Sequence, residues 1–177
     1  MTIPNVITIL RLLSVPLLIV AITQASYTFA FLLFLAAGIS DAVDGFIARR
    51  WNMRTELGAY IDPLADKALL VSIYVTLSMT GILPGWLAVL VVSRDVMIVA
   101  GILVARLMDR PMPIRPLFVS KMTTAGQIAF AALLLGLLAS GHGRVPAIDW
   151  GTVAVAALTL ASAGGYLLRW LRHMNAA

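Results

Sequence analysis

Apolar stretches long enough to cross a bilayer recur along the chain, and they limit it to a narrow set of folds. A helix needs roughly 20 residues to span a hydrocarbon core of about 30 Å. Six stretches approach or exceed this length, at residues 4–22, 27–48, 58–79, 84–106, 116–138 and 150–171. The composition agrees, because 61% of the 177 residues are hydrophobic, well above the share in soluble domains. We therefore expect one all-α domain over residues 1–177, a polytopic bundle of six transmembrane helices in the lipid bilayer.

Basic residues concentrate in alternate connectors, which predicts the orientation of this bundle. One group follows the second stretch and another surrounds the fourth connector: Arg49, Arg50, Arg54, and Arg106, Arg110, Arg115, Lys121. By the positive-inside rule, these two connectors and both the N- and C-termini are cytoplasmic. The same topology accounts for the net charge of +5, so we expect no nucleic-acid partner. The opening reaches its first basic residue only at Arg11, unlike a signal peptide, and we expect it to be retained as the first span.

Four aspartates interrupt the second and third apolar stretches. Each charge inside a membrane helix costs about 2.5–3.5 kcal/mol on insertion scales, so four of them require compensation. Asp41 and Asp44 are three residues apart, and Asp62 and Asp66 are four apart, so each pair lies on one face of its helix. The two helices are consecutive and antiparallel, so the acidic faces can meet near the cytoplasmic end. Converging carboxylates, in a chain without cysteine, favour hard cations such as Mg²⁺ or Mn²⁺.

A purely structural role is the alternative for these acids. They would then cap helices or form ion pairs with Arg49, Arg50 and Lys67. That interpretation suits a single aspartate near a helix end better than four at two same-face spacings. Ion pairing alone seldom compensates so many buried acids, and we therefore favour a metal site.

Small residues and one arginine accompany the acids. Gly45 follows Asp44, Ala48 lies one helical turn further on, and Gly58 lies one turn before Asp62. Such positions let a phosphorylated ligand approach the backbone closely, although helix–helix packing uses small residues in the same way. Arg49 adds a planar donor suited to phosphate oxygens, or else an interfacial anchor.

Together these residues resemble the signature of the CDP-alcohol phosphatidyltransferase family. The pattern fills every fixed position: Asp41, Asp44, Gly45, Ala48, Arg49, Gly58, Asp62 and Asp66. The six-span layout, the Pro4-Asn5 opening and the run from Asp62 to Lys67 are also similar to this family. The resemblance therefore covers essentially the whole chain.

The resemblance implies an enzyme that transfers a phosphatidyl group from CDP-diacylglycerol to an alcohol and releases CMP. The implied metal ligands are Asp41, Asp44, Asp62 and Asp66, holding two divalent ions, Mg²⁺ or Mn²⁺, with Asp66 also the catalytic general base. The implied CDP-binding residues are Asn5, Asp44, Gly45, Ala48, Arg49 and Gly58. By the same resemblance we expect a homodimer in a bacterial or mitochondrial inner membrane, with the active site on the cytoplasmic or matrix side.

A second basic group bears on the acceptor alcohol. Arg94 interrupts the fourth stretch, and Arg115 and Lys121 flank the start of the fifth, so these three are candidate acceptor-binding residues for an anionic lipid or glycerol phosphate. The alternatives are that Arg94 and Asp95 neutralise each other inside the bundle, and that Arg115 serves only topology.

Local segments separate two possible acceptors. Residues 93–97 and 118–124 resemble CMP-forming cardiolipin synthases, whose acceptor is phosphatidylglycerol. Residues 3–11 and 45–52 resemble phosphatidylglycerophosphate synthases, whose acceptor is glycerol 3-phosphate. The latter usually carry a second lysine where this chain has Thr123, and one cation fewer suits a phosphodiester better than a monoester. We therefore favour cardiolipin synthesis over phosphatidylglycerophosphate synthesis.

Two other function classes fit intramembrane acids. A small cation transporter would use them as an ion path, but such proteins show internal repeats or broken spans, and neither is evident here. A metal-dependent lipid phosphatase would release inorganic phosphate rather than CMP, so the reaction product separates it from a transferase.

Overall fold

The structure is a computed structural model that describes residues 3–50, 56–108, 118–142 and 145–175. Within these ranges the chain forms helices and no strands. The helices are α1 (Ile3–Thr23), α2 (Tyr27–Arg50), α3 (Glu56–Met79), α4 (Gly85–Leu107), α5 (Phe118–Ala139) and α6 (Pro146–Asn175). The predicted all-α class is confirmed, and each predicted stretch corresponds to one helix.

Three tight turns reverse the chain at one end of the molecule, and they share one capping geometry. Ala25, Gly81 and Gly141 each follow a helix with a positive φ, and the amide after each donates to a carbonyl five residues back. This closure satisfies helix-terminal carbonyls that would otherwise lack partners. Glycine adopts the left-handed conformation without strain, whereas Ala25 adopts it at φ 56° despite its Cβ.

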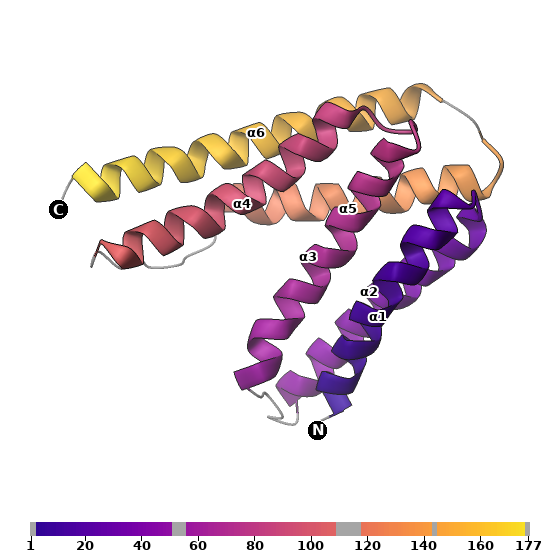
Figure 1. Ribbon diagram of the computed structural model, residues 1–177, viewed down its shortest axis with the longest axis horizontal. Helices are drawn as coiled ribbons and strands as arrows, with labels where there is room; N and C mark the ends of the chain where they lie inside the picture. Colours follow the sequence, from indigo (N-terminus) through magenta and orange to yellow (C-terminus); the bar gives the residue numbers. More distant parts are fainter. Residues whose placement is uncertain (1–2, 51–55, 109–117, 143–144, 176–177) are drawn as a thin grey trace.

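The helices converge at these turns and diverge toward the opposite end (Figure 1). One arm holds α1, α2 and the lower part of α3, while α4 and α6 run side by side in the other. Helix α3 also packs against α4 and α5, and α5 packs against α2, so the arms share a core near the turns. Both chain ends lie toward the diverging end.

Much of the described surface is apolar, which indicates a lipid environment. The core is formed by side chains such as Leu18, Ile73, Leu87 and Leu134, all fully buried. Large apolar side chains of every helix nevertheless point outward. Extended apolar surface of this kind is unfavourable in water and favourable against acyl chains.

Three of the helices are long and apolar enough to cross a membrane over their described residues. These segments are Gly85–Ala105, Phe118–Ala139 and Pro146–His173, and shorter apolar segments run over Ile7–Thr23 and Tyr27–Asp41. The findings support an integral membrane protein. The six-span count and the cytoplasmic termini remain predictions.

Candidate metal centre and substrate cavity

Arg11 joins two of the predicted metal-ligating aspartates from different helices. Its Nη1 lies 2.7 Å from Oδ1 of Asp66 on α3 and 3.0 Å from Oδ1 of Asp41 on α2. Helix α1 supplies the arginine because it packs against both α2 and α3. Two residues 25 positions apart in the sequence are thereby brought to one point, as the predicted convergence of the acidic faces requires.

The three charged groups differ sharply in exposure. The side chain of Arg11 is 1% exposed, whereas those of Asp41 and Asp66 are 46% and 47% exposed. A buried guanidinium needs compensating anions, and the two carboxylates provide them. The guanidinium of Arg11 is therefore buried among protein atoms, and the two carboxylates are the accessible groups.

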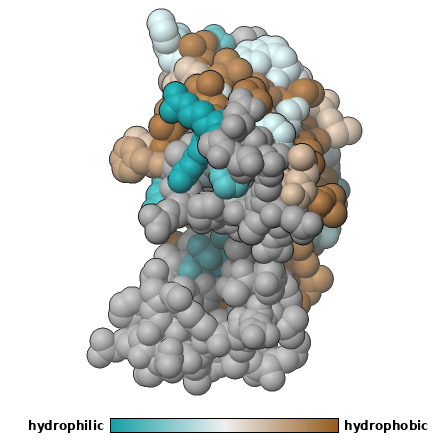
Figure 2. Space-filling view, turned by 90° about the vertical axis from the view of Figure 1, so that its left-hand side faces the viewer, coloured by the Kyte–Doolittle hydropathy of each residue, from teal (hydrophilic) through white to brown (hydrophobic). Residues whose placement is uncertain are grey.

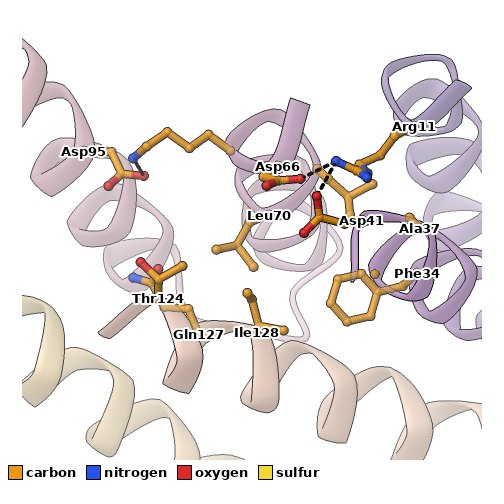
Figure 3. A pocket seen from close by; sticks show the side chains of 13 residues that line it. Arg11, Phe34, Ala37, Asp41, Asp66, Leu70, Asp95, Thr124, Gln127 and Ile128 are labelled. Atoms are coloured by element: carbon orange, nitrogen blue, oxygen red, sulfur yellow. Dashed lines mark hydrogen bonds and ion pairs between the residues drawn. The ribbon is translucent and has the colours of Figure 1, made fainter. Parts of the chain in front are cut away.

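A cavity of about 160 Å³ adjoins the two aspartates. Residues of five helices line it, with Arg11, Asp41, Asp66, Lys67 and Asp95 forming its charged part. Its remaining wall is mainly apolar, and includes Phe34 and Ala37 of α2, Leu70 of α3 and Ile128 of α5 (Figure 3). Figure 2 views the diverging end of the molecule and shows hydrophilic residues within a hollow of that face. Charged groups beside an apolar wall suit a ligand with a polar head and acyl chains.

A second polar cluster lies across the cavity from Arg11. The Asp95 carboxylate on α4 forms two ion pairs. One is with the Lys67 ammonium at 2.7 Å, and the other is with Nη1 of its neighbour Arg94 at 2.6 Å. Arg94 also donates to Ser162 of α6 from Nε at 3.1 Å and from Nη2 at 2.8 Å, and Nη2 donates to Ser120 of α5. The cluster therefore connects four helices. It contains the Arg94–Asp95 pair that the structural alternative predicted, together with Lys67, Ser120 and Ser162.

The predicted acceptor residues occupy different environments. Arg94 is 4% exposed and its hydrogen bonds point into the bundle. Lys121 is exposed on α5, next to Ser120. Arg115 lies outside the described residues. Arg94 of α4 donates to Ser120, the residue before Lys121 on α5, and the binding of an acceptor by Arg94 and Lys121 remains a prediction.

Several other predicted residues have side chains outside the described part of the structure. The backbone of each is helical: Asn5 in α1, Asp44, Gly45, Ala48 and Arg49 in α2, Gly58 and Asp62 in α3. Among described side chains, no group of three or more His, Asp or Glu residues forms a metal cluster. The two predicted ligands that can be compared, Asp41 and Asp66, do meet at the cavity. Their accessible carboxylate oxygens are the donors that Mg²⁺ and Mn²⁺ prefer, so the described pair fits a hard cation.

The sequence does not indicate the contacts of Arg11 or the partner of Lys67. The signal available for Arg11 is its place inside an apolar helix, because a charged residue there indicates a functional site. The sequence offers Lys67 as an ion-pair partner of the metal-site aspartates, whereas the structure pairs it with Asp95. Both pairings depend on the packing of distant helices.

Comparison with known proteins places this geometry in a family. The family model described as CDP-alcohol phosphatidyltransferase matches residues 1–168. The chain belongs to the CDP-alcohol phosphatidyltransferase family. Asp41 and Asp66, two of the residues predicted to form the signature of this family, are the acids that pair with Arg11 at the cavity.

Relatives of this family member carry two kinds of name. The chain is 36% identical to the human "Cardiolipin synthase (CMP-forming)" over 150 residues, which cover 76% of this chain and 50% of the human protein. It is 32% identical to the protein of that name from Streptomyces coelicolor, over 86% of this chain and 76% of the relative. It is also 36% identical to a "Probable phosphatidylglycerophosphate synthase" of Mycobacterium tuberculosis, over 97% and 82%. The chain spans about half the length of the human relative.

Proposed function

We propose that this family member transfers the phosphatidyl group of CDP-diacylglycerol to phosphatidylglycerol, giving cardiolipin and CMP. The observation that carries the proposal is the meeting of Asp41 and Asp66 at the edge of a mainly apolar cavity. Acids of the family signature, drawn from separate helices to one accessible point, suit a reaction at a diphosphate. The apolar wall beside them suits substrates whose acyl chains stay in the bilayer.

Asp41, Asp44, Asp62 and Asp66 are the proposed ligands of two divalent ions. Bound Mg²⁺ or Mn²⁺ would neutralise the diphosphate and stabilise charge on the attacking and leaving oxygens. Asp41 and Asp66 present their carboxylates at the cavity for this purpose. Asn5, Gly45, Ala48, Arg49 and Gly58 are the proposed contacts of the CDP part, in agreement with their positions in the family signature.

Asp66 is the proposed general base. The acceptor hydroxyl oxygen attacks the β-phosphorus of CDP-diacylglycerol and forms the new phosphorus–oxygen bond. The bond from the β-phosphorus to the bridging oxygen breaks, so CMP leaves with that oxygen, and the hydroxyl proton passes to the Asp66 carboxylate. Asp66 is suited to this role because nearly half of its side chain is accessible while Arg11 fixes its orientation.

The environment of Thr123 supports phosphatidylglycerol as the acceptor. Thr123 is fully buried, and its hydroxyl donates to the Leu158 carbonyl of α6 at 2.9 Å. This position, where the alternative subfamily usually has a lysine, offers no cation to a substrate. Arg94, Arg115 and Lys121 remain the proposed acceptor-binding residues, a set better matched to a phosphodiester than to the dianionic glycerol 3-phosphate.

The proposal includes the arrangement of the protein in the membrane. Six helices would span the bilayer, with both termini and the diverging end of the bundle on the cytoplasmic or matrix side. The homodimer expected from the family resemblance belongs to this proposal. A site opening at that end would let a water-soluble CMP leave while the lipid product returns to the bilayer.

One assay tests the proposal and its main alternative. CMP release by the detergent-solubilised protein would be followed with CDP-diacylglycerol and Mn²⁺, using phosphatidylglycerol or glycerol 3-phosphate as acceptor. Release with phosphatidylglycerol alone is expected. Release with glycerol 3-phosphate alone would replace the acceptor while retaining the chemistry. Inorganic phosphate in place of CMP, or no product in either arm, would contradict phosphatidyl transfer to these acceptors.

A further inference from the structure

We propose that Arg11 is a positioning residue that holds the metal-binding carboxylates of α2 and α3 in place before a cation arrives. The inference rests on the proposed metal-dependent function and assigns a role to a residue outside the family signature. Its basis is the double ion pair of a single guanidinium nitrogen, at 3.0 Å to Asp41 and 2.7 Å to Asp66.

Arg11 contacts the two acids from the buried side. Its side chain is 1% exposed, whereas nearly half of each aspartate side chain is exposed at the cavity. Figure 3 shows the guanidinium reaching both carboxylates from the α1 side. A cation entering through the cavity would thus meet the acids on their accessible side, while the arginine stays on the protein side.

The charge of Arg11 can offset the repulsion between the two carboxylates. Two carboxylates from neighbouring helices repel each other, and the repulsion is strong where water screens it poorly. A buried guanidinium between them offsets the repulsion and fixes which oxygens face the cavity. Groups that orient metal ligands in this way typically change metal affinity by about 10- to 100-fold when they are removed.

A competing role for Arg11 predicts the opposite change in metal affinity when the residue is replaced. If Arg11 acted as a substitute cation that must leave when metal binds, its removal would strengthen metal binding. The positioning role predicts weaker binding, because the carboxylates would separate. The direction of the change therefore distinguishes the two roles, independently of turnover.

The test is Mn²⁺ binding to the solubilised full chain without lipid substrates, measured by electron paramagnetic resonance of the free ion. Arg11→Gln is expected to weaken binding by about 10- to 100-fold. Arg11→Lys should recover part of the loss, because it keeps the charge without the planar fork. Arg172→Gln, an exposed arginine near the end of α6, is the matched control and should bind as the parent does.

Folding is monitored by gel filtration and thermal melting, and Arg11→Lys keeps the test decisive if Arg11→Gln does not fold. Parent-like or tighter Mn²⁺ binding by folded Arg11→Lys and by any folded Arg11→Gln would overturn the positioning role. Absence of Mn²⁺ binding by the parent would overturn it together with the proposed metal site. Normal Mn²⁺ binding by the parent, weakened in the variants but without CMP release, would support the role of Arg11 and contradict the proposed transfer.

Discussion

Lys67 and Asp95 form an ion pair between α3 and α4, with the ammonium nitrogen 2.7 Å from Oδ2 of the aspartate. Lys67 directly follows the proposed base, and both ion-pair partners line the cavity that Asp66 lines. Asp95 also pairs with the buried Arg94. The acidic pair on one side of the cavity is thus faced by the Lys67–Asp95 ion pair on the other, so a ligand in the cavity meets groups of both charges.

We expect Lys67→Gln to raise the KM for the acceptor more than the KM for CDP-diacylglycerol. The Lys67 side chain is 47% exposed and lines the cavity that Asp66 also lines, so an acceptor phosphate can reach it. One charge-assisted hydrogen bond corresponds to about 1.5–3 kcal/mol, or roughly tenfold or more in KM. Steady-state CMP release with each substrate varied in turn gives both constants. An effect restricted to the donor would contradict acceptor contact, and Arg172→Gln should change neither constant.

Arg94 and Lys121 should separate stability from acceptor binding. Arg94 is buried and bonded to Asp95, Ser120 and Ser162, so Arg94→Ala should destabilise the fold by about 1–3 kcal/mol besides raising the acceptor KM. Lys121 is exposed, so Lys121→Ala should raise the acceptor KM at an unchanged melting temperature. Thermal melting in detergent and CMP release measure the two effects. Equal melting temperatures for both variants would show that the Arg94 network contributes nothing to stability.

Asp66→Asn should lower CMP release by about 10²–10⁴-fold, the usual contribution of a general base, while some CDP-diacylglycerol binding remains. The amide keeps the shape of the side chain and cannot take the acceptor proton. Asp41→Asn and Asp62→Asn should abolish turnover and also weaken Mn²⁺ binding, because their proposed role is ligation. Asp149→Asn, in the first turn of α6, is the control and should be active. Near-parent turnover by Asp66→Asn would remove Asp66 from the role of base.

Chelation should stop the reaction reversibly. Carboxylate ligands bind Mg²⁺ and Mn²⁺ through oxygen, and the proposed chemistry requires such ions. We expect CMP release to disappear in excess EDTA and to return when Mn²⁺ or Mg²⁺ exceeds the chelator. Monovalent salt at matched ionic strength is the control. Undiminished release in EDTA would contradict metal dependence.

The sequence predicted the helices well because apolar length and turn residues are local properties. The second stretch was predicted at 27–48 and α2 runs over Tyr27–Arg50. The last stretch was predicted at 150–171, whereas α6 runs over Pro146–Asn175. The prediction followed hydropathy, but the helix continues into polar residues: Pro146 suits a helix start, Asp149 lies in the first turn, and Arg172 lies in the last, where the helix dipole favours each charge.

The candidate site was predicted only in part, for a physical reason. Spacing within one helix showed that Asp62 and Asp66 share a face, since that follows from the helical repeat. The pairing of Asp66 with Arg11 joins residues 55 positions apart and depends on how α1 packs against α3. The pairing of Lys67 with Asp95 likewise requires the approach of α3 to α4. Single-helix periodicity contains no information on such contacts.

Gly151 should be the most sensitive small residue of the α5–α6 contact. A Cβ added there would collide with the ring of Phe130, which is 5% exposed and belongs to the core. Overpacking of this kind costs about 1–3 kcal/mol, so Gly151→Ala should lower the melting temperature in detergent. Gly164 lies in the same helix, and a Cβ there meets nothing within 4 Å. Gly164→Ala should therefore be neutral or stabilising by up to about 1 kcal/mol, because alanine favours the helix. If both variants melted alike, the close approach of α6 to Phe130 would not limit the packing of these helices.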